Sequence, residues 1–198
     1  MRKDLTKRLL AEAIKELSKV KNLNKITIKD ICDYCECNHS TFYYHFADKD
    51  DLIEWIIKTD IEDHFNKVDT EIWTNNTYHL LCTFQKHCAF YRQCLTMNTH
   101  NSLPKLINDI NQRAITQYLD NRLGSQQISE EARNFFIHFW SAAFSDTNIR
   151  YIMDDAATAP EKMLQYYYNF TEPVLDMVIQ NFIDTDRSKG MKPISAKE

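Results

Sequence analysis

The chain has 198 residues and a net charge of −4, with 43% hydrophobic and 26% charged residues. This composition excludes a disordered chain, because it supplies enough apolar side chains for a core. It holds only two glycines and four prolines. These are too few for the closely spaced turns of a β-sandwich or barrel, and for the clustered glycines of a dinucleotide-binding motif or a P-loop. The sequence therefore predicts an all-α fold.

The sequence predicts a cytoplasmic protein with no membrane partner. Its apolar runs are far shorter than the about 20 residues needed to span a bilayer. The N-terminus leads into an amphipathic stretch, which is not typical of a signal peptide. The six cysteines are expected to be reduced thiols in that compartment.

Positive charge is concentrated at the N-terminus. Residues 1–29 contain nine Lys or Arg and three acids, a net charge of +6, whereas the remaining 169 residues carry −10. A basic head on an acidic body indicates a local contact with a polyanion. A solvated amphipathic helix explains the same charges equally well.

The first predicted element is an amphipathic helix of about four turns. Leu5, Leu9, Ala13 and Leu17 recur every four residues, with Leu10 and Ile14 beside them, and charged residues fill the other face. The pattern breaks at residues 21–24.

Two short helices are predicted next. Thr27 and Asp30 have the spacing of a capping box at the start of one, and Asn38 is a good N-cap for the other, which continues to Phe46. Phe42 lies four residues before Phe46, so both can share a buried face while the polar and tyrosine residues point away. Two such helices joined by a tight turn are typical of a helix-turn-helix.

A longer helix is predicted from about residue 48 to 69.

Residues 27–55, TIKDICDYCECNHSTFYYHFADKDDLIEW, strongly resemble the DNA-binding region of the TetR family of bacterial transcriptional regulators. The hallmark is the stretch 41–46, TFYYHF, followed by Asp48, Lys49 and Leu52. The resemblance covers roughly residues 5–60. It implies a three-helix DNA-binding domain over residues 1–48 and a helical ligand-binding and dimerisation domain over 49–198. The family often has glycine where this chain has Glu36, so a positive φ at that position would strain the turn.

The resemblance also implies which side chains contact duplex DNA. They are Thr27, Asn38, His39, Ser40, Thr41, Tyr43, Tyr44, His45 and Lys49. Thr27, Tyr44, His45 and Lys49 are expected mainly at phosphates. His39, Ser40 and Tyr43 are expected at base edges or thymine methyl groups, because the recognition helix reaches them from its N-terminal residues.

A run of soft ligands overlaps this motif. Cys32, Cys35, Cys37 and His39 could hold zinc or copper and make the protein a metal- or thiol-responsive regulator. Their spacing is not that of a standard zinc site, and the three cysteines fall where the family places small core residues. We therefore favour core packing, and we expect no bound metal or cofactor.

Helices separated by short breaks are predicted for the rest of the chain. The expected ranges are 77–96, 104–123 closed by Gly124, 129–153, and 160–182 with a kink at Pro173. The residues from 184 onward are expected to be frayed.

The resemblance implies a homodimer joined by the last two large helices, which presents two recognition helices to a palindromic operator. The nearly all-apolar stretch 135–140 agrees, because such a helix must be buried on more than one side. It also implies a pocket for an inducer, with candidate lining residues Phe84, His87, Tyr91, Phe139 and Trp140. The C-terminal half resembles the branch that includes regulators of dihydroxyacetone kinase operons, where the signal can come from a partner protein.

The sequence thus predicts a sequence-specific DNA-binding regulator. A repressor is expected, because repression is the commoner outcome in the family that the chain resembles. It is not expected to be an enzyme, because no nucleophile elbow, metalloprotease helix or phosphate loop occurs. A helical adaptor that does not bind DNA is the remaining alternative.

Overall fold

The computed structural model describes residues 2–65, 72–97 and 102–190, and this part of the chain contains helices and no strands. The helices are α1 (Arg2–Leu17), α2 (Ile28–Tyr34), α3 (His39–His45), α4 (Lys49–Phe65), α5 (Ile72–Lys86), α6 (Cys88–Cys94), α7 (Leu103–Leu123), α8 (Glu130–Met153), α9 (Pro160–Tyr166) and α10 (Glu172–Gly190), with short turns η1 (Leu23–Lys25) and η2 (Tyr167–Thr171). The predicted all-α class is confirmed. Within these residues no helix is both long and apolar enough to cross a bilayer.

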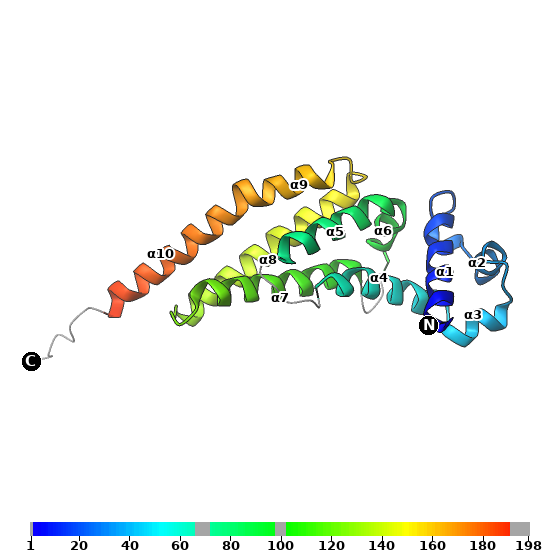
Figure 1. Cartoon of the computed structure of the whole chain (residues 1–198), viewed down its shortest axis with the longest axis horizontal. Helices are drawn as coiled ribbons and strands as arrows, with labels where there is room; N and C mark the ends of the chain where they lie inside the picture. The colour runs from blue at the N-terminus through cyan, green and yellow to red at the C-terminus, as the bar shows by residue number, and fades with distance from the viewer. Residues whose placement is uncertain (1, 66–71, 98–101, 191–198) are drawn as a thin grey trace, which may run out of the picture.

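The described part of the molecule is elongated, with α1–α3 at one end and the last turns of α10 at the other (Figure 1). The long helices α7 and α8 pack along each other and, with α4 and α5, form the body of the C-terminal part. Helix α4 packs against α1, α5 and α7, so it joins the two parts. The predicted end of this helix at 69 lies outside the described residues.

The predicted apolar face of α1 is buried only in part. Leu10, Ala13 and Ile14 are buried, whereas Leu5 and Leu9 are exposed. A row of residues spaced by four advances 40° around a helix at each step, because a turn takes 3.6 residues. The row from Leu5 therefore winds from solvent into the core.

The predicted helix 77–96 is wrong as a single element, because it breaks at His87 into α5 and α6. In an unbroken helix Phe90 would lie about 120° around the axis from Phe84. The break allows both rings to be fully buried.

Residues 184–190 are not frayed as expected, because α10 continues to Gly190; residues 191–198, which were also expected to be frayed, lie outside the described residues. The last turns of α10 are held by the loop between α7 and α8: Asp186 accepts a hydrogen bond from the Ser129 backbone N–H at 2.6 Å, and Arg187 donates to Gln126.

The irregularity expected at Pro173 is present as the π-helical turn η2 just before it. A wider turn suits proline, which lacks the N–H of a regular helix and collides with the preceding turn.

Candidate DNA-binding site

The helix-turn-helix is built on local caps. The Thr27 hydroxyl accepts a hydrogen bond from the Asp30 backbone N–H at 3.2 Å, and Asp30 accepts one from the Thr27 backbone N–H at 2.7 Å, which confirms the capping box. The Lys21 ammonium, 2.6 Å from the same carboxylate, and the two Thr27 donors hold the pKa of Asp30 well below its usual range. Thr27 is exposed at the start of α2, where a phosphate can reach it.

The turn between α2 and α3 is closed by a Schellman motif. Cys37 N–H donates to the Cys32 carbonyl at 3.0 Å, and Glu36 N–H donates to Asp33 at 3.3 Å. This motif places its first residue beyond the helix cap in the left-handed region, where glycine is favoured. Glu36 occupies that position with φ 51°, so the positive φ considered for this turn is present.

Asn38 caps α3 as predicted and organises its first turn. Its side-chain oxygen accepts hydrogen bonds from the Thr41 backbone N–H at 2.8 Å, the Ser40 hydroxyl at 2.7 Å and the Thr41 hydroxyl at 2.8 Å. Both hydroxyls are thus satisfied within the cap, although Asn38, His39 and Ser40 are exposed. A base or phosphate must compete with these bonds for the hydroxyl protons.

The two faces of α3 divide as the sequence predicts. Phe42 is fully buried and Phe46 nearly so, with ring centroids 6.0 Å apart. Tyr43 and Tyr44 are 57% and 65% exposed. His45 is half-buried, with its ring edge-to-face against Tyr44 at 4.9 Å. A short helix on an aromatic base therefore presents two tyrosines outward, together with the exposed His39 and Ser40.

Lys49 has a contact that the sequence analysis missed. Its ammonium donates to the carbonyls of Leu23 at 2.8 Å, Ile26 at 3.0 Å and Asn24 at 3.4 Å. These carbonyls lie in the connection between α1 and α2, so Lys49 fixes that connection from the first turn of α4. The motif spacing gives no signal for this contact, since the partners are 23 to 26 residues away.

The soft ligands do not converge. Within the described part of the chain, no three of Cys32, Cys35, Cys37 and His39 bring their ligand atoms within 4.8 Å of one another. The thiols of Cys32 and Cys35 instead donate to the carbonyls of Asn38 and Leu9. Burial raises the pKa of each of these two thiols to about 11, so both are protonated at neutral pH.

The residues predicted to line a ligand pocket fall into two groups. Phe84 and Tyr91 are buried with ring centroids 5.0 Å apart, and His87 lies between them in sequence at the start of α6. Phe139 and Trp140 are on α8, and Phe139 is half-exposed and stacked on Phe135. A surface pocket of about 320 Å³ lies elsewhere, between α4 and α7; its lining residues are Asp51, Glu54, Trp55, Ile57, Lys58, Lys105, Leu106 and Asp109.

Polar contacts join the helix-turn-helix to the body through α6. Tyr91 donates its hydroxyl to Asp60 at 2.5 Å, and the nearly buried Lys15 ammonium lies 2.6 Å from the same carboxylate oxygen. Gln93 donates to the Ser18 carbonyl at 2.9 Å and accepts from the Leu23 N–H. These contacts were not predicted from the sequence. The sequence signal that could have indicated them is the spacing of Ala11, Lys15 and Ser18 along one helix face, and the structure buries all three.

Two family models match the chain. Residues 9–56 match "Bacterial regulatory proteins, tetR family". Residues 71–173, more than half of the chain, match "Transcriptional regulator C-terminal region". The chain belongs to the TetR family. Members of this family are transcription regulators and not enzymes, which confirms the prediction that this chain is no enzyme.

Two similar proteins are DhaS regulators of dihydroxyacetone kinase operons. The chain is 25% identical over 95 residues to the HTH-type dhaKLM operon transcriptional activator DhaS of Lactococcus lactis subsp. lactis (strain IL1403). That alignment spans 48% of this chain and about half, 51%, of the relative. A solved structure, the dihydroxyacetone kinase operon activator DhaS, superposes with a TM-score of 0.73 at 19% identity, covering 90% of this chain and 98% of that one. This likeness supports the fold.

Proposed function

We propose that this TetR-family regulator binds duplex DNA through the outer face of α3, which enters the major groove of a palindromic operator. The observation that carries the proposal is the exposure of Tyr43 and Tyr44 above the buried Phe42. DNA offers phosphates, base edges and thymine methyl groups to two such exposed tyrosines. The proposed contact set remains the nine residues predicted from sequence, although the Lys49 ammonium must release one of its three carbonyl partners to reach a phosphate.

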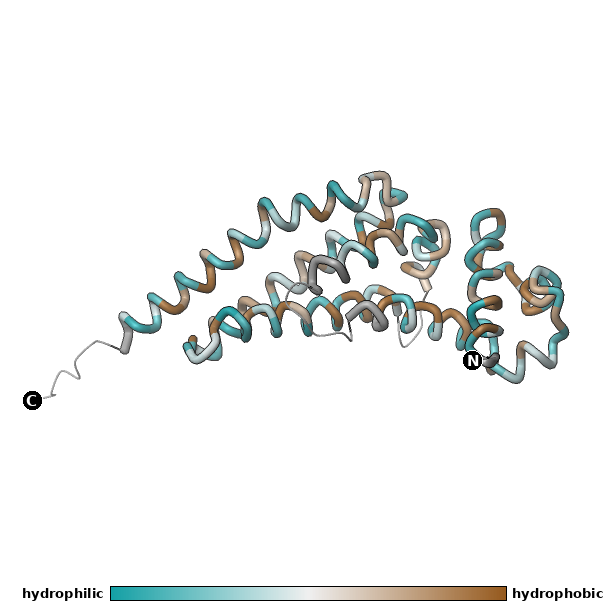
Figure 2. The backbone as a smooth tube through the Cα atoms, viewed as in Figure 1, coloured by the Kyte–Doolittle hydropathy of each residue, from teal (hydrophilic) through white to brown (hydrophobic). Residues whose placement is uncertain are grey.

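We further propose that a second copy of the chain covers the apolar surface of α8 and α10. Phe135 and Phe139 on α8 are 60% and 52% exposed and stacked on each other. Phe170, Val174 and Met177 recur at helical spacing before and within α10 and are also exposed. Figure 2 shows such hydrophobic residues in brown along α10, between hydrophilic ones. Contiguous exposed apolar surface of this kind marks an interface.

In this proposal, a ligand or partner protein bound to the C-terminal part changes operator affinity. Such control requires that the effector bind two arrangements of the dimer with different affinity. The seam formed by Lys15, Asp60 and Tyr91 connects α6 to α4 and α1, which supports a route for the change. The sequence analysis expects repression. The Lactococcus lactis relative is described as an activator, and we propose activation for this chain.

The proposal is tested by selecting bound fragments from genomic DNA and measuring their affinity by fluorescence anisotropy. Affinity should fall steeply as salt rises, because phosphate contacts release counterions. Tyr44→Ala should weaken binding to all sequences, and Tyr43→Ala should change the selected motif. Tyr34→Ala, an exposed tyrosine on α2, is the control and should do neither. Absence of any duplex binding at low salt would leave the adaptor as the better interpretation.

The dimer and the sign of regulation have separate tests. Light scattering should give twice the chain mass for the native protein and for Val20→Glu, which alters an exposed apolar residue outside the proposed interface. Phe139→Glu should give the monomer mass, because a carboxylate cannot be buried unpaired against the partner. A reporter gene behind the selected operator should rise when the protein is expressed; a fall would show repression.

A further inference from the structure

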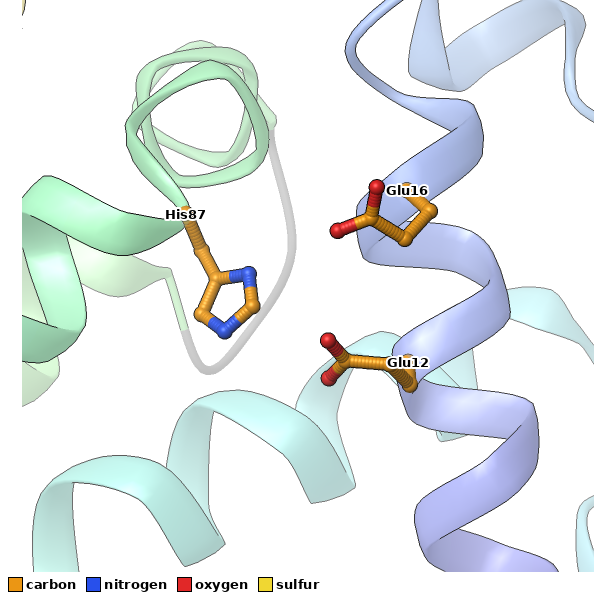
Figure 3. Close-up of side chains that lie close together, drawn as sticks. All are labelled: Glu12, Glu16 and His87. Carbon is orange, nitrogen blue, oxygen red and sulfur yellow. The ribbon is translucent and has the colours of Figure 1, made fainter.

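Three ligand-type side chains meet where α1 faces the turn between α5 and α6 (Figure 3). Glu12 and Glu16 are four residues apart on α1, so their carboxylates lie on one face of the helix. His87, between α5 and α6, points its imidazole across the gap toward both carboxylates. The ligand atoms of all three residues lie within 4.8 Å of one another.

The His87 imidazole is built into this position without an internal partner. The residue is only 5% exposed, and within the described residues its Nδ1 atom is buried with no hydrogen-bond partner. It occupies the N-cap position of α6, yet its side chain makes no capping hydrogen bond. Buried polar atoms in proteins are almost always satisfied, so an orphaned nitrogen aimed at two carboxylates requires an explanation.

Within the described residues, each of the two carboxylates pairs with an exposed lysine side chain. Lys19 lies 2.5 Å from Glu16, and Lys86 lies 3.7 Å from Glu12, both as exposed ion pairs. Such pairs contribute little stability because water screens them. The third cation near the site, Lys15, is already neutralised by Asp60. A divalent cation can thus replace the two exposed ammonium groups.

We propose that Glu12, Glu16 and His87 bind a divalent first-row transition-metal ion such as Zn²⁺ or Co²⁺. One imidazole and two carboxylates form a mixed nitrogen and oxygen ligand set. Zn²⁺ and Co²⁺ accept such a set, whereas Mg²⁺ and Ca²⁺ prefer sites made of oxygen ligands alone. Three protein ligands leave further coordination positions to water. The site is separate from Cys32, Cys35 and Cys37, and it does not require that the chain bind DNA.

A bound ion joins two parts of the fold. Glu12 and Glu16 belong to the first helix of the helix-turn-helix part, and His87 belongs to the C-terminal part. The ion binds only when these parts are packed as in the folded chain, so its binding stabilises that packing and raises Tm.

The test is a titration of the metal-free, reduced full-length protein with Co²⁺, followed by absorption spectroscopy and then by competition with Zn²⁺. One Co²⁺ should bind per chain, and its spectrum should lack the thiolate-to-cobalt charge-transfer band. Glu16→Gln and His87→Gln should each lower the affinity at least about tenfold. Glu131→Gln, an exposed carboxylate on α8, and Cys37→Ser should leave the affinity unchanged.

The site variants also need a check that they fold. Circular dichroism should show the same helix content for every variant, and Glu16→Gln preserves the fold because the residue lies at the surface of α1. With saturating Zn²⁺, Tm should rise for the native chain and much less for Glu16→Gln. The proposal is overturned if no saturable binding occurs, if Glu16→Gln binds as tightly as the native chain, or if the thiolate band is present and disappears in Cys37→Ser.

Discussion

The buried triad of Lys15, Asp60 and Tyr91 should contribute more to stability than any surface ion pair of this chain. The side chains of Lys15 and Asp60 are 8% and 22% exposed, and Tyr91 is fully buried. Asp60→Ala leaves a buried ammonium and a buried hydroxyl without their common acceptor. Removal of one partner from a buried pair costs about 3–5 kcal/mol. Because water reaches part of Asp60, we expect about 3 kcal/mol, or a Tm lower by about 6–12 °C.

Tyr91→Phe separates the two components of this loss. It removes the hydroxyl but keeps the ion pair and the ring packing, so it should cost about 1–2 kcal/mol. When Tyr91→Phe is added to Asp60→Ala, the additional loss of unfolding free energy should be much smaller, because the hydroxyl no longer has its acceptor. The double-mutant cycle measures this coupling between Asp60 and Tyr91.

Urea unfolding at pH 7 and one fixed protein concentration gives these free energies. Asp146→Ala is the matched control, because it breaks the exposed pair with Arg150 on α8 and should cost less than about 0.5 kcal/mol. The reasoning is refuted if Asp60→Ala costs no more than this control.

Three further changes test the helix-turn-helix. Glu36→Gly should stabilise the chain by about 1 kcal/mol in urea unfolding, since glycine adopts the positive φ of this turn without strain; a loss of stability would show that the turn is not strained. Phe42→Ala should destabilise by about 3–5 kcal/mol and remove the near-ultraviolet circular dichroism of this part, whereas Tyr44→Ala should leave stability within about 0.5 kcal/mol. Lys49→Met should cost about 1–3 kcal/mol, because three carbonyls lose their donor; an unchanged urea midpoint would reduce Lys49 to a phosphate contact.

Sequence reasoning worked where the structure depends on neighbours along the chain. The caps formed by Thr27 and Asn38 each join residues three positions apart, and the end of α7 at Gly124 is set by a single residue type. The opposed faces of Phe42 and the tyrosines follow from helix periodicity alone. These features position the recognition helix, so most of the candidate site could be predicted.

Sequence reasoning failed where a polar side chain finds a partner far along the chain. Asp60 lies 45 residues from Lys15 and 31 from Tyr91, and no local pattern distinguishes it from the other acids of α4. The break at His87 was missed for a related reason, since it is decided by the need to bury Phe90 against the body and not by a breaker residue. Burial requirements of this kind come from tertiary packing, which overrides helix propensity.

Helix α1 contacts both parts of the molecule. One of its faces buries Leu10 and Ile14 in the core of the helix-turn-helix part. A second carries Lys15 to Asp60 on α4, and that carboxylate also accepts from Tyr91 on α6. Any shift of α6 along α4 must therefore break the Tyr91 bond to Asp60 or carry α4 and α1 with it. If the proposed control operates through α6, a signal there should displace the recognition helix through Asp60, and Asp60→Ala should uncouple the two.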